Sequence, residues 1–393
     1  MTDLLRRLVA HDRTRDPALV ARKHDRMRAS PFAFLRGSCR LFYDTLPSAT
    51  GREPLVWGCG DLHLENFGSY RGENRLTYFD LNDFDDATCL PATAELVRLV
   101  ASILLAAEEM DLPRAAATGL ARTFLEAHRA ALVRGAPRWV ERESARGIVR
   151  TLLDQVGHRT RKGLLLRRTS GTGTARRLQI DGERQLAVDG RLKRQVRVAL
   201  VRAFRDDPTW GGLRVLDVAH RVAGVGSLGV QRYVALVRPA LTGKSTLLDL
   251  KEARPTDAVV AGAARRPRFA SDVERVVTLQ ARLQAMPPAL LRGIRVRERG
   301  FVLRELQPSA DRVELAAWRD QPTALTELMS TLADVVAWAR LRSSGRGGAD
   351  NADQLIAWAT DRAWVADTLA RGKQAAAQVK EQFRAFDRAL GGR

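Results

Sequence analysis

The spacing of hydrophobic and polar positions changes several times along the 393 residues. Residues 1–50 have a helical pattern that the segment Ser30–Gly37 (S-P-F-A-F-L-R-G) interrupts, because Pro31 and Gly37 punctuate the pattern. Short apolar runs at Leu55–Trp57 and Leu76–Phe79 predict two strands. From Pro91 to about Val133 the apolar residues again recur at helical spacing. This part of the chain is therefore predicted to be mainly helical, with a small β component.

Residues 134–205 are very basic and contain a segment rich in glycine and threonine, Thr169–Thr174, which predicts a mobile loop or an insertion. A new unit is expected to begin near Asp206, with a helix at about Ser271–Leu283. Its strand-like runs are Arg214–Val222, Val230–Val237, Leu247–Leu250 and Gly300–Leu306. After residue 310 the pattern is almost entirely helical as far as Leu390.

These patterns predict an α+β protein with three regions. Residues 1–205 form a mainly helical region, residues 206–310 a β-rich region, and residues 311–393 a helical C-terminal region. The content of 45% hydrophobic and 28% charged residues is typical of a globular protein.

The sequence gives no indication of a membrane or an oxidising compartment. No window approaches the run of apolar residues that a membrane-spanning helix requires, and the first residues lack the pattern of a signal peptide. Cys39, Cys59 and Cys89 have neither the number nor the spacing of a disulfide framework or a C-x-x-C metal site. A reduced, cytoplasmic protein is therefore expected.

The formal net charge of +20 is carried mainly by arginine, since only seven of the 65 basic residues are lysine. Such a bias is often a consequence of genomic base composition. A basic surface still favours anionic partners. Nucleic-acid binding through the basic segment 134–205 is therefore kept as an alternative function.

Acidic residues are concentrated in two short motifs, Trp57–Gly68 (W-G-C-G-D-L-H-L-E-N-F-G) and Phe79–Asp86 (F-D-L-N-D-F-D-D). Phosphoryl transfer gives such a cluster a purpose, because it needs a carboxylate for the acceptor's proton and oxygen ligands for Mg²⁺. Two other interpretations remain open. The acids could cap turns and helices, or they could bind the metal of a hydrolase.

A glycine-rich segment, G-V-G-S-L-G, lies between the predicted strands Arg214–Val222 and Val230–Val237. A dinucleotide-binding loop opens a helix, whereas a strand on each side is the arrangement of a kinase loop whose amides cover ATP phosphates. The residues predicted to contact the nucleotide are Gly224, Gly226, Ser227 and Gly229. The alternative is an ordinary glycine hairpin.

Lys251 ends the next strand-like run and is predicted to hold the α- and β-phosphates of ATP. Glu274, in the following helix, is predicted to pair with Lys251. Glu274 also forms a capping-box pattern with Ser271, which is a purely structural alternative. A solvated lysine is the corresponding alternative for Lys251.

The G-D-x-H-x-x-N pattern of the first motif is similar to the catalytic loop of aminoglycoside and choline kinase-type phosphotransferases. The resemblance implies that Asp61 is the catalytic base, that His63 belongs to the same catalytic loop and mainly orders it, and that Asn66 binds magnesium. The second motif resembles the metal-binding run of the same enzymes. It implies Asp83 as the main magnesium ligand and Asp85 as a second one.

The ordered set of motifs also resembles one bacterial family, domain-of-unknown-function family twenty-two fifty-two. The resemblance covers roughly residues 20–310 and includes R-M-R-A-S-P-F-A-F-L-R-G, both acidic motifs, the glycine-rich segment and L-K-E-A. In that family the C-terminal helices often contain an alanine-histidine-alanine-arginine-serine-glycine run. The counterpart here is Ala339–Gly345, in which Arg340 stands in place of the histidine.

The catalytic-loop motif precedes the glycine loop and Lys251, which reverses the order of an ordinary kinase chain. The expectation is therefore a protein-kinase-like bilobal fold with its lobes in circularly permuted order. The expected function is ATP- and Mg²⁺-dependent phosphate transfer to an unidentified hydroxyl acceptor. A pseudokinase-like nucleotide-binding or scaffolding module without turnover is the first alternative, and a basic nucleic-acid-binding protein is the second.

Overall fold

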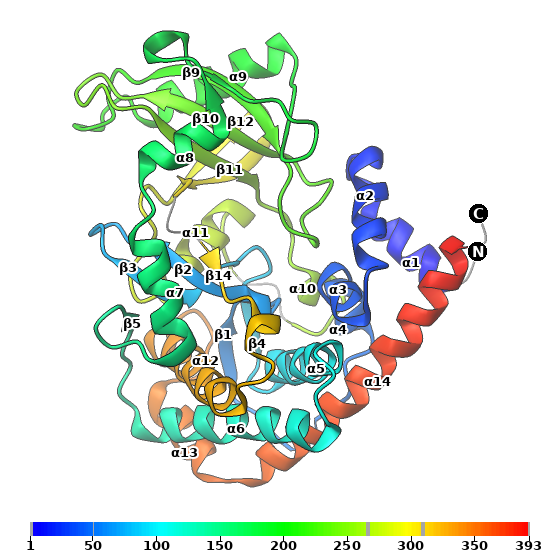
Figure 1. The fold of residues 1–393 in the computed structure, drawn as a ribbon. Helices are drawn as coiled ribbons and strands as arrows, with labels where there is room; N and C mark the ends of the chain where they lie inside the picture. The colour runs from blue at the N-terminus through cyan, green and yellow to red at the C-terminus, as the bar shows by residue number, and fades with distance from the viewer. Residues whose placement is uncertain (1–2, 50, 265–267, 308–310, 392–393) are drawn as a thin grey trace.

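The structure is a computed structural model that describes residues 3–49, 51–264, 268–307 and 311–391. It is a mixed α+β fold in which all the strand pairs are antiparallel. A six-stranded sheet lies at one end of the molecule and a group of long helices at the other (Figure 1). The predicted α+β class is confirmed. The expected boundary after residue 310 falls at residues 308–310, outside the described residues.

Four short helices begin the chain: α1 (Asp3–Asp12), α2 (Pro17–Met27), α3 (Pro31–Gly37) and α4 (Cys39–Asp44). The helical pattern predicted for residues 1–50 is confirmed, but the segment expected to interrupt it is itself helix α3, because proline in a first turn starts a helix instead of breaking it. Their starts have clear local causes. The Asp16 carboxylate accepts hydrogen bonds from the first amides of α2, and Ser30 caps α3 in the same way. Each of these two helices also has proline in its first turn, where the missing N–H costs nothing.

The two acidic motifs are built on two small sheets. The first sheet pairs β1 (Leu55–Gly58) with β4 (Thr88–Pro91). The second has the order β14-β2-β3-β5, where the strands are Asp311–Arg312, Phe67–Arg71, Thr77–Leu81 and Val140–Glu141. The predicted strands at 55–57 and 76–79 are confirmed, and the pairing of β2 with β3 brings the ends of the two motifs together.

The larger sheet has the order β12-β13-β11-β10-β9-β8. Its strands are Arg292–Val296, Arg299–Glu305, Thr246–Glu252, Arg232–Arg238, Arg214–Arg221 and Gln185–Leu186. The four predicted strands of this region are present as β9, β10, β11 and β13. The side chains of β10 alternate between the two faces, as the period of two in a strand requires. Tyr233 and Ala235 face α9 (Gly190–Ala203), whereas Val234 packs with α8 (Arg161–Arg168).

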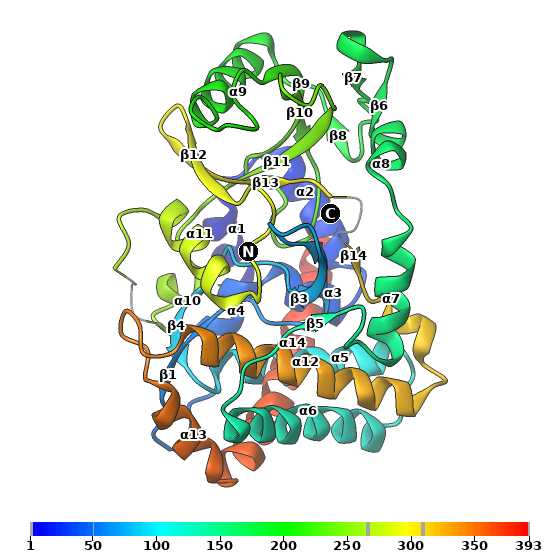
Figure 2. The same cartoon turned by 90° about the vertical axis from the view of Figure 1, so that its left-hand side faces the viewer.

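Two expectations for the basic segment differ from the structure. The sheet unit includes β8 and α9, so it begins before the boundary expected at residue 206. Segment Thr169–Thr174 is not simply a loop, since β6 (Thr169–Ser170) pairs with β7 (Arg177–Leu178) across a short 3-10 turn at Gly173–Ala175. The hairpin and α8 cover the apolar part of the sheet opposite α9 (Figure 2). Glycine and threonine content indicated a turn but could not show that its flanks pair.

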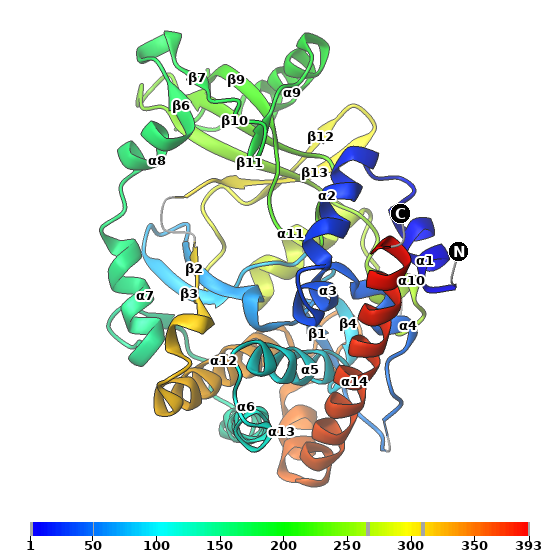
Figure 3. The same ribbon diagram turned by 45° about the vertical axis from the view of Figure 1, so that its right-hand side comes forward.

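The main core lies among the helices at the other end of the molecule. Helix α5 (Ala94–Glu109) is buried on almost all sides and packs against α6 (Arg114–Arg134) and α14 (Ala363–Gly391), while α12 (Pro322–Ser343) packs against α6 (Figure 3). The remaining helices are α7 (Gly147–Gly157), α10 (Asp257–Val260), α11 (Asp272–Leu283) and α13 (Ala352–Thr360). Among the described residues, none of the helices combines the length and the apolar character needed to cross a bilayer.

Candidate functional site

A cavity of about 910 Å³ lies between the larger sheet and the helical part of the molecule. Segments that are far apart in the sequence line it, including both acidic motifs, the glycine-rich loop and β11. The predicted site residues that line the cavity are Asp61, His63, Asn66, Asp83, Asp85, Gly224, Gly226, Ser227 and Lys251. The chain therefore brings nearly the whole predicted set to one place.

The conformation of the loop that carries Asp61 depends on Gly60 and on the buried side chains that bond to the backbone of Gly60. Gly60 has φ +81°, and a Cβ at this position would lie 1.9 Å from the backbone oxygen of Asp86. Only glycine meets both conditions. The Gly60 amide donates to the Glu95 carboxylate at 3.3 Å, and its carbonyl accepts from the Tyr43 hydroxyl. The position of Asp61 is thus set by tight packing against the second acidic motif.

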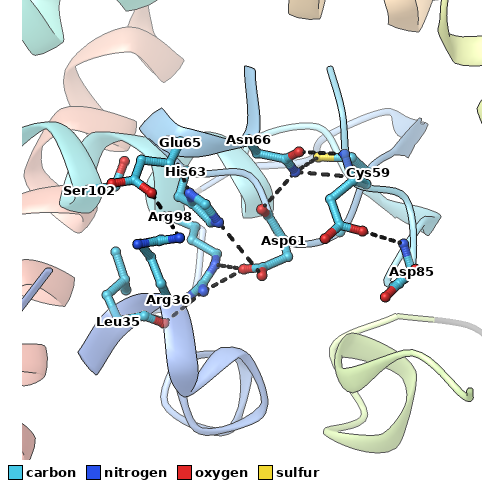
Figure 4. Close-up of polar contacts among 12 residues, drawn as sticks. Leu35, Arg36, Cys59, Asp61, His63, Glu65, Asn66, Asp85, Arg98 and Ser102 are labelled. Atoms are coloured by element: carbon cyan, nitrogen blue, oxygen red, sulfur yellow. Dashed lines mark hydrogen bonds and ion pairs between the residues drawn. The ribbon is translucent and has the colours of Figure 1, made fainter. Parts of the chain in front are cut away.

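The Asp61 carboxylate is held from behind by Arg98 of α5 (Figure 4). Oδ1 of Asp61 is 2.7 Å from Nε and 2.5 Å from Nη2 of Arg98, whose side chain is fully buried. Burial raises the pKa of Asp61, and the adjacent Arg98 charge opposes that rise. The other carboxylate oxygen, Oδ2, is 3.9 Å from Nε2 of His63.

His63 organises the loop and carries no charge at neutral pH. Its Nδ1 accepts a hydrogen bond of 3.1 Å from the amide of Glu65, which starts the 3-10 turn Leu64–Asn66. Burial, followed by the charges of Arg36 and Arg98, holds the pKa of His63 well below its usual value. The hydrogen bond orders the turn that follows His63, and the catalytic part of the expectation for His63 stays a prediction.

Asn66 joins the two acidic motifs. Its side-chain Nδ2 donates to the carbonyl oxygens of Asp61 and Asp83, at 3.1 and 3.2 Å, and its Oδ1 accepts from the Asp83 amide at 2.7 Å. These bonds fix the two loops relative to each other. The Oδ1 atom retains a second lone pair for a ligand.

Lys251 reaches the second acidic motif from the opposite side of the cavity. Its Nζ lies 3.2 and 3.1 Å from the two carboxylate oxygens of Asp83 and also forms an ion pair with Asp85. Burial alone would raise the pKa of Asp83, but Lys251 and then Arg304 lower it to about 2. Burial and the Asp83 charge raise the pKa of Asp85. Two carboxylates therefore converge on one cation.

The glycine-rich loop connects β9 to β10, as the sequence predicted. Gly224 and Gly229 have φ values of +78° and +82°, which favour glycine. The loop is held by the N-terminal helices, a contact that the sequence did not indicate. Arg15 Nη1 donates to the carbonyls of Gly226 at 2.5 Å and Leu228 at 2.9 Å. The loop is therefore tied to the segment between α1 and α2.

The predicted pairing of Glu274 with Lys251 is wrong in this structure. The Glu274 carboxylate accepts a hydrogen bond of 2.7 Å from the amide of Ala270, and Ser271 Oγ accepts one of 3.1 Å from the Glu274 amide. Glu274 therefore caps α11, which was the structural alternative. Lys251 has Asp83 and Asp85 as its partners instead, because these carboxylates reach it across the cavity.

Replacing Ser271 by alanine is expected to cost about 1 kcal/mol in the free energy of unfolding, because an N-cap bond is lost. Replacing Glu274 by alanine should have a similar, small effect and leave any stabilisation by Mg-ATP unchanged. Urea denaturation with and without Mg-ATP measures both quantities. A Glu274→Ala variant that loses stabilisation by Mg-ATP would reinstate Glu274 as a partner of the nucleotide site.

One family model, described as an uncharacterised protein conserved in bacteria (DUF2252), matches residues 15–389. The match covers nearly the whole chain. This protein belongs to the DUF2252 family. No curated protein and no solved structure matches the chain.

Arg340, the residue that the family resemblance aligned with a histidine, lies behind the loop that carries Asp61. Arg340 is buried in α12, 3.1 Å from the Glu95 carboxylate and 3.0 Å from Nε2 of His128. Glu95 in turn accepts from the amide of Gly60. Arg340 thus supports the backbone of the loop through Glu95, a role that its position in the sequence could not show.

The sequence analysis also did not identify Arg98 as a site residue. The available signal was a lone arginine in an otherwise apolar helix, one turn after Glu95. A buried arginine needs a partner, so its position within α5 indicated a carboxylate nearby. The pattern could not show that this carboxylate belongs to Asp61.

A third group of potential ligands lies beside the cavity. Ligand atoms of Cys39, Asp86 and Asp257 lie within 4.8 Å of one another. The Asp257 amide already donates to Asp86 at 2.7 Å, and His11 Nε2 lies 2.8 Å from the Asp257 carboxylate. Burial raises the pKa of the Cys39 thiol well above its usual value, which disfavours the thiolate that a metal would need. These contacts hold α1, α4 and α10 together at the cavity wall.

Proposed function

We propose that this DUF2252 protein is an ATP- and Mg²⁺-dependent phosphotransferase that acts on a hydroxyl acceptor. The supporting observation is the meeting of Lys251 with Asp83 and Asp85 in the cavity that Asp61 and the glycine loop also line. Phosphoryl transfer requires these groups together: a cation and loop amides for the phosphates, oxygen ligands for the metal, and a carboxylate for the acceptor.

The arrangement also supports a kinase-like bilobal fold with its lobes in permuted order. The sheet that carries Lys251 and the glycine loop follows the acidic motifs in the chain, yet it covers the cavity from the opposite side. The small sheets and helices that carry Asp61 and Asp83 form the other side. In this proposal the sheet unit would serve as the nucleotide-covering lobe although it comes second in the sequence.

The residues present suit magnesium. Asp83, Asp85 and Asn66 offer oxygen atoms, which are the ligands that Mg²⁺ prefers. The two carboxylates already hold a cation, the ammonium group of Lys251. When bound at these residues, magnesium would neutralise charge on the phosphates and leave Lys251 free to contact them.

Each remaining group has a role in the proposed transfer. Asp61 Oδ2 accepts the acceptor's hydroxyl proton while the acceptor oxygen bonds to the γ-phosphorus and the bond to the bridging oxygen of ADP breaks. Lys251 and the amides of the glycine loop hold the phosphates. Because the transition state is largely dissociative, orientation of the hydroxyl by Asp61 is worth more than strong basicity.

Titration with Mg-ATP tests the proposal in the wild type, Asp83→Ala and Lys251→Ala, with thermal stability and γ-phosphate release followed together. At a hundredfold excess over the dissociation constant, binding should stabilise the wild type by about 2.7 kcal/mol. Both variants should lose most of this stabilisation, because one lacks the proposed metal ligand Asp83 and the other lacks the proposed phosphate contact Lys251. Asp206→Ala and Lys244→Ala, which change exposed residues, are matched controls that should keep it.

The combined readout separates the alternatives. Stabilisation with phosphate release supports the enzyme, whereas stabilisation without release supports a nucleotide-binding module that lacks turnover. If the wild type is not stabilised at all, the ATP site is wrong. Salt-sensitive binding of nucleic acid that survives Asp83→Ala would then favour the basic surface as the functional one.

A further inference from the structure

We propose that Arg98 is a positioning residue for the phosphate-transfer reaction, which fixes the Asp61 carboxylate so that a single oxygen faces the acceptor. This inference rests on the proposed function. It concerns a residue that does not line the cavity, so Arg98 acts only through Asp61.

The contact between the two side chains is close and rigid. Nε and Nη2 of Arg98 lie 2.7 and 2.5 Å from the same carboxylate oxygen, Oδ1 of Asp61. Nη2 also donates to the carbonyl of Leu35 at 2.9 Å (Figure 4). The guanidinium carbon lies 4.9 Å from the centroid of the Phe42 ring. A planar guanidinium held at three points has little freedom to rotate.

The geometry makes the two oxygens of Asp61 unequal. Oδ1 is engaged by Arg98, whereas Oδ2 lies 3.9 Å from Nε2 of the neutral His63 ring. The Asp61 side chain is 22% exposed and the Arg98 side chain 0%. Oδ2 is therefore the atom that an acceptor hydroxyl can reach.

Structural support alone does not explain this pair. Placing an arginine and an aspartate in a protein interior is often no more stabilising than apolar side chains of the same size. Nη1 of Arg98 is buried without a hydrogen-bond partner among the described residues, which adds to the cost. Arg98 lies in a helix that is otherwise nearly all apolar at its buried positions. A costly charge at this point is explained by the orientation that it gives to Asp61.

A double-mutant cycle between Arg98 and Asp61 tests the inference, with γ-phosphate release from Mg-ATP as the activity. Arg98→Gln should lower kcat by roughly 10- to 100-fold, since small misplacement of a reacting group costs up to about 10²-fold. The KM for ATP should stay within about twofold of the wild type. In the Asp61→Asn background, Arg98→Gln should have almost no further effect on kcat, because the carboxylate that Arg98 positions for the proton transfer is already absent.

Two further variants keep the test decisive. Arg98→Lys keeps the positive charge but loses the paired N–H groups of the guanidinium, so its kcat should lie between those of Arg98→Gln and the wild type. The lysine variant also takes the place of Arg98→Gln in the test if the glutamine variant does not fold. Arg371→Gln is a matched control: Arg371 is a buried arginine that bonds Thr93 at 2.6 Å and Glu53 at 3.2 Å, away from Asp61. It should lower stability and leave kcat unchanged.

The outcomes are distinguishable. If wild-type kcat survives in Arg98→Gln, or if the losses of the two single variants multiply in the double variant, Arg98 does not act through Asp61. A rise in the KM for ATP with unchanged kcat would likewise overturn the inference. If the wild type releases no phosphate and is not stabilised by Mg-ATP, the proposed function itself fails and the inference falls with it.

Discussion

Asparagine in place of Asp61 is expected to slow γ-phosphate release from Mg-ATP by about 10²–10⁴-fold, the usual contribution of a positioned acid or base. Asparagine keeps an oxygen that can accept from Arg98, so the loop should keep its conformation. Stabilisation by Mg-ATP should therefore remain close to that of the wild type. Steady-state kinetics and thermal unfolding on the same samples measure the two effects.

Alanine at the same position makes a useful contrast. It would leave the buried Arg98 charge without its partner, and breaking a buried ion pair costs about 3–5 kcal/mol. Asp61→Ala should therefore lose stability as well as activity. Asp334→Asn, which changes a carboxylate paired with Arg134 outside the cavity, should affect neither strongly. Near wild-type release by Asp61→Asn would remove Asp61 from the role of base.

The largest effect on stability is expected at Asp249, on the cavity-facing side of β11. Its buried carboxylate lies 2.9 Å from Arg221 Nη1, 2.7 Å from Arg232 Nη2 and 3.6 Å from Arg304 Nε. Asp249→Asn would leave three arginines in the sheet without their shared anion. The free energy of unfolding should fall by about 3–5 kcal/mol, the cost of breaking a buried ion pair. Urea denaturation at neutral pH measures this loss.

The pH dependence follows from the direction of the pKa shift. Burial alone would raise the pKa of Asp249, but Arg221 and Arg232 hold it well below its usual value. The unfolded chain therefore binds this proton more readily, so the stabilisation is complete above about pH 4 and is lost as the pH falls. The free energy of unfolding of the Asp249→Asn variant should therefore fall less on acidification than that of the wild type.

A matched aspartate lies in β9 of the same sheet, with β10 between it and β11. Asp217 of β9 pairs with Lys193, whose side chain is 42% exposed, so Asp217→Asn should cost clearly less than Asp249→Asn. Equal losses for the two variants would mean that the three arginines do not depend on Asp249.

Much of the fold could be read from local patterns. Strand-like runs located β9, β10, β11 and β13, and helical spacing with a serine cap located α11. The short strands β8, β12 and β14 were missed because two to five residues carry too little pattern to be recognised. The membership of β8 and α9 in the sheet unit was missed for another reason: pairing between segments is not a local property.

The residues of the candidate site likewise fall into those that a local motif predicted and those that only packing between separate elements brings to the site. Asp61 and Asn66 are five residues apart, so one loop fixes their relation, and the sequence motif carried that information. Arg98 and Arg15 were not identified, because each reaches its partner through packing between separate elements. Glu274 was assigned to Lys251 by analogy with kinases, but its carboxylate instead accepts a hydrogen bond from the Ala270 amide at the start of α11.

The sequence by itself determined the elements that short-range spacing encodes: the capped helices, the alternating strands, the left-handed turns at glycine and the two acidic loops. Only the tertiary structure decided that Lys251 meets Asp83, which lies 168 positions away in the chain, together with Asp85, and that Arg98 lies behind Asp61. The physical reason is that charged side chains reach a buried partner through the packing of whole elements, and that packing depends on apolar contacts spread over the entire chain.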